Sequence, residues 1–61
     1  MTYAILYDGE EPTAVYRFAR DRQASSVAAW LRGQGRGDLL PANARNAASI
    51  ARERGLDVID C

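Results

Sequence analysis

Few side chains in this 61-residue chain could carry out catalysis, because the chain has no histidine and a single cysteine. Nucleophilic and acid–base catalysis place a nucleophile beside a base that titrates near neutral pH, most often histidine. Ser25, Ser26 and Ser49 have no lysine that could replace it, and Cys61 is the last residue. The sequence therefore predicts no catalytic site and a protein that is not an enzyme.

Carboxylates crowd one short segment, where Asp8, Glu10 and Glu11 surround a glycine. Such oxygen ligands suit magnesium or calcium, but their spacing differs from that of a twelve-residue calcium-binding loop. The tip of a solvent-exposed hairpin has the same composition. A structural zinc site needs four cysteine or histidine ligands, which the chain does not have. We therefore predict no bound metal and no other cofactor.

The segment 33–38, Gly-Gln-Gly-Arg-Gly-Asp, contains the Arg36-Gly37-Asp38 tripeptide that integrins bind. Chance explains the tripeptide better, since the chain shows no sign of export. The alternating glycines lack the spacing of a dinucleotide-binding loop, which also has to follow a strand. Glycine disfavours both helix and strand, so the segment is predicted to be a flexible connection.

All eight basic residues are arginines, and they gather in the middle of a chain whose net charge is zero. Residues 17–54 hold the eight arginines against three carboxylates, a local balance of +5. Arginine and asparagine are residues that contact phosphates and base edges, which makes five residues candidates for binding nucleic acid: Arg32, Arg36, Arg45, Asn46 and Arg52. The alternative is that the basic middle pairs with the acidic ends inside the fold.

Two strands are predicted at the start of the chain, over residues 2–7 and 13–19, which are rich in strand-forming residues. Asp8-Gly9 favours a tight turn. Pro12 has no N–H to donate to a ladder, so a five-residue loop over 8–12 is the better prediction. This register pairs Ile5 with Val15 and Leu6 with Ala14.

A first helix is predicted from Asp21, as N-cap, to Gly33, with a buried stripe formed by Ala24, Val27, Ala28 and Leu31. A second should run from Pro41 to Arg54 and end at Gly55 as a left-handed C-cap. Its small inner residues predict packing against the first helix: Ala44, Ala47, Ala48 and Ala51, with Ile50 beside them. Residues 56–59 complete the pattern as a short strand.

These elements predict one α+β domain over residues 1–61, in the order β-β-α-α-β. A mostly antiparallel three-stranded sheet would carry both helices on one face. The other face would then have no cover, although its residues have the aromatic and arginine-rich composition of protein interfaces. The predicted protein-binding residues are Tyr3, Ile5, Tyr7, Val15 and Arg17.

From this face we hypothesise a small non-enzymatic module that acts by contact with, or occlusion of, a protein partner or a second copy of itself. The alanine-rich, lysine-free composition is typical of a GC-rich bacterial or phage genome. An inhibitor of a host defence complex, encoded by a phage or mobile element, would suit the size. A cytoplasmic location is expected, because neither a signal peptide nor an apolar run of about 20 residues is present.

A strand followed by two helices in so short a chain resembles the ribbon-helix-helix repressors in element order and size. The additional strands and the long glycine-rich connection depart from that pattern. The resemblance implies an alternative function, a dimeric DNA-binding transcriptional regulator that places a strand in the major groove.

Overall fold

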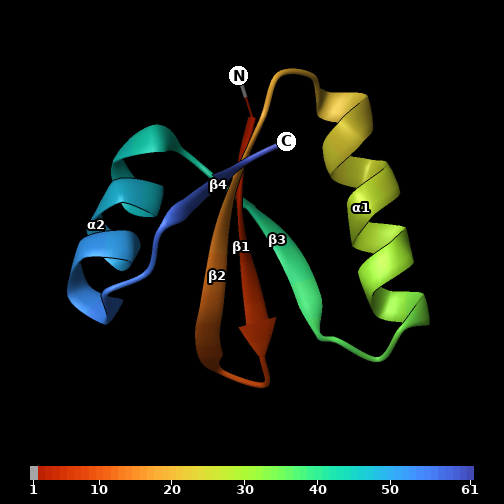
Figure 1. The fold of residues 1–61 in the computed structure, drawn as a ribbon, viewed down its shortest axis with the longest axis horizontal. Coiled ribbons are helices and arrows are strands. Elements are labelled where there is room, and N and C mark those ends of the chain that lie inside the picture. The colour runs from red at the N-terminus through yellow and green to blue at the C-terminus, as the bar shows by residue number, and fades with distance from the viewer. Residues whose placement is uncertain (1) are drawn as a thin grey trace.

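A four-stranded mixed sheet forms the centre of the fold, with one helix on either side of it (Figure 1). The computed structural model describes residues 2–61, apart from the side chain of Asp21. The elements in chain order are β1 (Thr2–Asp8), β2 (Glu11–Phe18), α1 (Asp21–Gly33), β3 (Asp38–Ala42), α2 (Ala44–Arg54) and β4 (Val58–Asp60). The α+β class is therefore confirmed, whereas the predicted three-stranded sheet is wrong by one strand.

The sheet has the strand order β3-β1-β2-β4. The central hairpin β1–β2 and the pair β1–β3 are antiparallel, and β4 lies parallel to β2. The last strand begins at Val58, two residues after the predicted start. The N–H of Cys61 donates to the carbonyl of Arg17 at 2.9 Å, which ties the last residue to β2.

The hairpin has the predicted register but a shorter turn. Ile5 pairs with Val15 and Leu6 with Ala14, as expected. The five-residue loop is wrong, because the strands continue to the Asp8–Glu11 pair and leave a two-residue turn.

A bulge accounts for this difference. The register shifts between Leu6 and Tyr7, so that Thr13 stands outside the ladder and Pro12 lies opposite Tyr7. The hydroxyl of Thr13 donates to the carbonyl of Leu6 at 3.2 Å.

The strand β3 replaces the predicted start of the second helix. Leu39, Leu40 and Pro41 extend along β1, and Pro41 lies opposite Ala4. Proline is tolerated here because β3 is an edge strand, where a missing N–H need not break a ladder. The second helix consequently begins at Ala44, three residues later than predicted.

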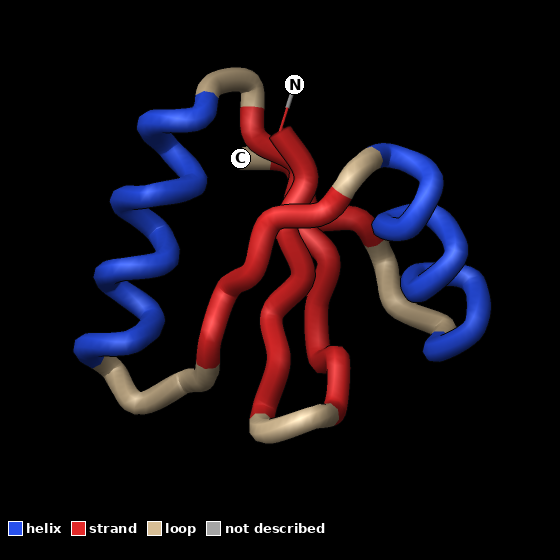
Figure 2. Tube along the Cα trace, turned by 180° about the vertical axis from the view of Figure 1, so that it is seen from behind, coloured by secondary structure: helices blue, strands red, loops and turns tan. Residues whose placement is uncertain are grey.

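The two helices cover opposite faces of the sheet, and Figure 2 shows the same arrangement from behind. Alternate residues of a strand point to opposite faces. One buried cluster joins Leu31 of α1 and Leu39 of β3 to even-numbered positions of the hairpin, which are Ala4, Leu6 and Phe18. The other joins Ala47 of α2 to Ile5 and Val15. The prediction that both helices share one face, packed through their alanines, is therefore wrong.

The reason for this error lies in β3. After α1, the chain adds β3 to the outer edge of β1 and then continues to α2 on the other side of the sheet. The segment Ala4, Ile5 and Leu6 is buried at three successive positions. Such a run is typical of a strand that is covered on both faces.

Local hydrogen bonds fix the ends of both helices. The N-cap of α1 is Arg20, not the predicted Asp21, and its N–H donates to the side chain of Gln23 at 3.1 Å. The predicted stripe of α1 does pack against the core. Asn43 caps α2 by accepting from the N–H of Asn46 at 2.7 Å. Gly55 is the left-handed C-cap that the sequence predicts, with φ of 64°. Neither helix, within residues 2–61, is long and apolar enough to cross a membrane.

Candidate functional site

The sheet face predicted to be open is largely covered by α2. Ile5 and Val15 are only 3% and 0% exposed, so almost none of either side chain lies at the surface. Tyr3 and Tyr7 are half-buried and pack against the same cluster. The expectation of an uncovered face is therefore wrong, although its composition correctly marks a face that needs cover.

Arg17, the fifth residue of the predicted set, is engaged within the chain. Its guanidinium forms an ion pair with the carboxylate of Asp60 on β4. The hydrogen bond to Asp60, and after it one with Tyr3, raises the pKa of Arg17 above its ordinary value. Arg17 thus holds the short edge strand β4 against β2.

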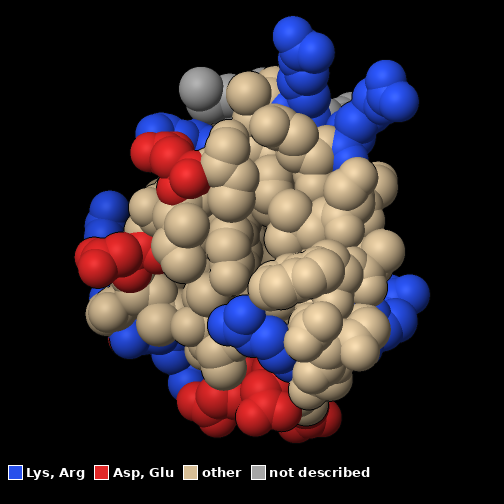
Figure 3. All heavy atoms as spheres, turned by 45° about the vertical axis from the view of Figure 1, so that its right-hand side comes forward, with Lys and Arg blue, Asp and Glu red and all other residues tan. Residues whose placement is uncertain are grey.

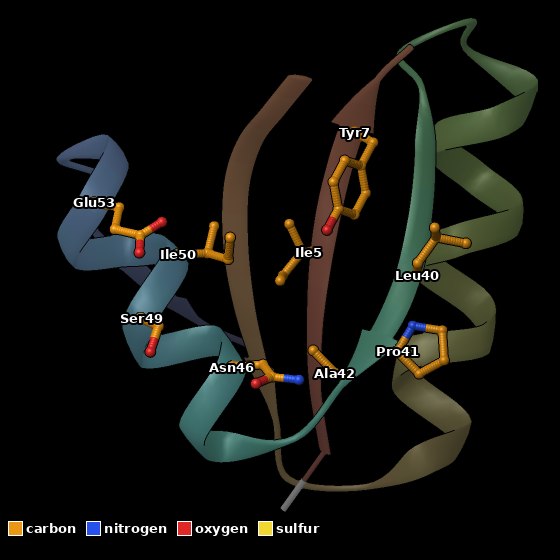
Figure 4. Close-up of a pocket in the computed structure, with 9 residues that line it drawn as sticks. All are labelled: Ile5, Tyr7, Leu40, Pro41, Ala42, Asn46, Ser49, Ile50 and Glu53. Atoms are coloured by element: carbon orange, nitrogen blue, oxygen red, sulfur yellow. The ribbon is translucent and has the colours of Figure 1, made fainter. Parts of the chain in front are cut away.

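A groove of about 350 Å³, called the α2-side groove below, remains open on this face, between α2 and β3 (Figure 4). It exists because α2 packs on β1 and β2, whereas α1 packs mainly on β3. The α2 side of β3 therefore has no helix above it. The residues that line the groove are Ile5, Tyr7, Leu40, Pro41, Ala42, Asn46, Ser49, Ile50 and Glu53.

One wall of the groove is a single face of α2. Asn46, Ser49, Ile50 and Glu53 stand three, four and seven residues apart, which places their side chains in a row along a helix. Their neighbour Ala47 is the one buried residue of α2. Because alanine is small, it packs on the sheet without filling the space toward β3.

The other wall and the floor are apolar. Leu40 on β3 is 50% exposed, and Ile5 and Tyr7 come from β1. Opposite these apolar residues, the wall of α2 supplies the amide of Asn46, the hydroxyl of Ser49 and the carboxylate of Glu53. A hollow with an apolar surface and a few polar groups is the usual form of a binding site.

A second groove of about 360 Å³ lies on the α1 side of β3. Its lining is Thr2, Ala4, Ala24, Ser25, Ala28, Leu39 and Pro41, with no charged residue among them. Figure 3 turns this side forward and shows a broad uncharged area, with acidic side chains gathered below it at the end of the β1–β2 turn. Small alanine and serine side chains offer fewer groups that could specify a ligand than those of the α2-side groove.

The five candidate nucleic-acid residues do not form one surface. Arg32 and Arg36 lie at the end of α1, on the opposite side of the sheet from Arg45, Asn46 and Arg52 of α2. The helices are also separated by β3, so the strand-helix-helix order that suggested the repressor family is not present.

The basic middle pairs in part with the acidic ends, the alternative that the charge pattern left open. Arg17 pairs with Asp60, and the guanidinium of Arg54 lies 3.1 Å from the carboxylate of Glu11. Within residues 2–61, no group of three or more potential metal ligands is close enough to hold an ion.

The Arg-Gly-Asp tripeptide has both of its charged side chains engaged. The guanidinium of Arg36 lies 5.7 Å from the ring centroid of Trp30, which is 55% exposed. Asp38 lies 3.7 Å from Arg32. A Cβ atom on Gly37, with φ of 114°, would lie 2.3 Å from the carbonyl oxygen of Tyr7. This glycine therefore allows close approach of two backbones, beyond the flexibility predicted for the segment.

Sequence reasoning missed Leu40, Ser49, Ile50 and Glu53 as site residues, and it named Asn46 only as a nucleic-acid contact. Only Ile5 and Tyr7 of the predicted protein-binding set line the groove. Comparison with models of protein families, with curated proteins and with solved structures gave no match. Function is therefore inferred from the geometry of the chain itself.

Proposed function

We propose that this chain is a small binding protein whose α2-side groove holds a segment of a protein partner. The observation that carries the proposal is Leu40, a half-exposed leucine beside an apolar floor and across from three polar side chains of α2. An aliphatic side chain seated in such a hollow is a typical anchor of a protein interface, and the polar groups around it give specificity.

The groove is a better candidate than the outer edge of β3. A partner strand that extends the sheet binds through main-chain hydrogen bonds, and Pro41 has no N–H to donate to it. Side-chain insertion beside β3 does not depend on that bond.

The chain would act by contact, since its sequence contains no histidine to serve as a catalytic base. By binding one segment of its partner, the chain would prevent that segment from contacting other molecules. Inhibition of a host defence complex is the specific role that we propose within this class.

Photo-crosslinking at two matched positions tests the proposal. The photoreactive amino acid p-benzoylphenylalanine would replace Leu40 in one variant and Ile59 in the other, an aliphatic residue of β4 that is 44% exposed. Irradiation in the native cells should give protein adducts from position 40 at several times the yield from position 59. Equal yields from both positions, or adducts from position 59 alone, would contradict the proposal. Adducts to nucleic acid would favour the DNA-binding alternative.

A further inference from the structure

We infer that the segment held in the groove is basic, with an arginine or lysine that pairs with Glu53 and an aliphatic side chain that packs beside Leu40. This inference rests on the proposed function and specifies the chemistry of the occupant. It follows from the charges at one end of the groove.

Glu53 is the one charged residue that lines the groove, and among residues 2–61 it has no ion-pair partner. Its neighbour Arg54 is engaged by Glu11 on the hairpin. Figure 4 shows Glu53 beside the end of the groove where Tyr7 lies, with Asn46 and Ala42 at the other end. A cationic side chain of the partner would therefore meet an available carboxylate at one end only.

Other negative charges surround the same end. Tyr7 is followed by Asp8 and then by Glu10 in the turn, and both carboxylates are exposed and without an ion pair among the described residues. The C-terminus of α2, with its partial negative charge, also points toward this end. Their combined field favours a cation.

Of the arginines that could offset this field, Arg52 adjoins Glu53 in the sequence and has no ion pair among the described residues, but it does not line the groove. Three others are engaged. Arg54 is paired with Glu11, and Arg32 with Asp38. Arg36 lies over the ring of Trp30 on the other side of the sheet. The ring of Tyr7 lines the groove near Glu53, so an incoming cation would also meet an aromatic ring.

The length of the α2 wall limits the spacing between the aliphatic side chain and the basic residue. Asn46 and Glu53 are seven residues apart, which is about 10 Å along a helix. An extended segment spans this distance with about three residues. Side chains two residues apart share one face of such a segment and lie about 7 Å apart, which fits within this length, so the aliphatic anchor and the cation are expected at positions i and i+2.

Peptide display tests this inference. A phage library of random ten-residue peptides would be selected on the immobilised wild-type chain, and enriched peptides would be made synthetically for affinity measurements. We expect an aliphatic residue two positions from an arginine or lysine. Glu53→Gln should weaken their binding about fivefold, the effect of an exposed ion pair at the upper end of its range. Asp57→Asn, which removes an exposed carboxylate outside the groove, should leave affinity unchanged.

Two kinds of failure are distinguishable. Enriched peptides that need Leu40 but carry no basic residue, and that bind Glu53→Gln as well as wild type, would overturn the basic occupant alone. Peptides that bind Leu40→Ser as tightly as wild type, or a selection that enriches none, would overturn the proposed function as well.

Discussion

The two faces of the sheet are covered by helices that pack in different ways. On the α1 face, the one buried residue among the described side chains of the helix is the large Leu31, which packs with Phe18 of β2. On the α2 face, the helix contributes a single buried residue, Ala47. A helix that buries large side chains stabilises the fold, whereas one that rests on alanine leaves room beside it. The groove is therefore a consequence of how lightly α2 packs.

Removing one large side chain from each side of the sheet gives the strongest test of this difference. Phe18→Ala should lower the free energy of unfolding by about 3 to 5 kcal/mol. A chain of this length is expected to have only about 3 to 9 kcal/mol in total. Ile50→Ala, at a half-buried position on the α2 side, should cost about 1 to 2 kcal/mol. Urea unfolding followed by circular dichroism measures both, and equal losses would break the comparison.

The close approach of the glycine-rich connection to β1 gives the next effect. Gly37→Ala places a methyl group against the backbone of Tyr7 and should cost about 2 kcal/mol or more. Gly35→Ala is the matched control, because Gly35 also has positive φ but has open space around its Cα. Its cost should be limited to about 1 kcal/mol for the left-handed backbone. The same measurement applies, and equal costs would mean that the connection does not rest on β1.

The third prediction concerns binding. Leu40→Ser should weaken the affinity for a selected peptide about tenfold, which is about 1.4 kcal/mol. Ile59→Ser changes a similarly exposed aliphatic residue on the far edge of the sheet and should leave the affinity unchanged. Fluorescence anisotropy with a labelled peptide would measure both. A larger loss from Ile59→Ser would move the site to β4.

The smallest effect is expected from the exposed arginines of α2. Arg45→Glu with Arg52→Glu should change the free energy of unfolding by less than about 0.5 kcal/mol, as surface substitutions usually do. Peptide affinity should not fall. Duplex DNA binding by the wild type that falls steeply with salt and is lost in this variant would instead support the DNA-binding alternative.

Much of the fold follows from local pattern. The Ile5–Val15 register, the stripe of α1 and the C-cap at Gly55 each depend on residues close in sequence, and all three are confirmed. The strand β3 was missed because Pro41 suits the first turn of a helix as well as an edge strand.

The ambiguity of Pro41 also explains why the predicted protein-binding face differs from the groove. With β3 read as part of a helix, both helices fall on one face and the tyrosine-rich face looks open. With β3 as a strand, α2 covers Ile5 and Val15, and the open space moves toward Leu40. The unbroken apolar segment from Tyr3 to Tyr7 could have indicated a strand covered on both faces. The groove itself depends on where α2 lies, which no local pattern specifies.

Backbone amide shifts give the most direct test of whether a partner segment binds in the α2-side groove. A 15N-labelled chain would be titrated with an enriched peptide from the display selection. We expect shift changes concentrated at Tyr7, Leu40, Asn46 and Ser49, with little change at Ser25 and Ala28, which line the groove on the α1 side of β3. Changes concentrated along α1 or β4, with the α2-side groove unaffected, would contradict it.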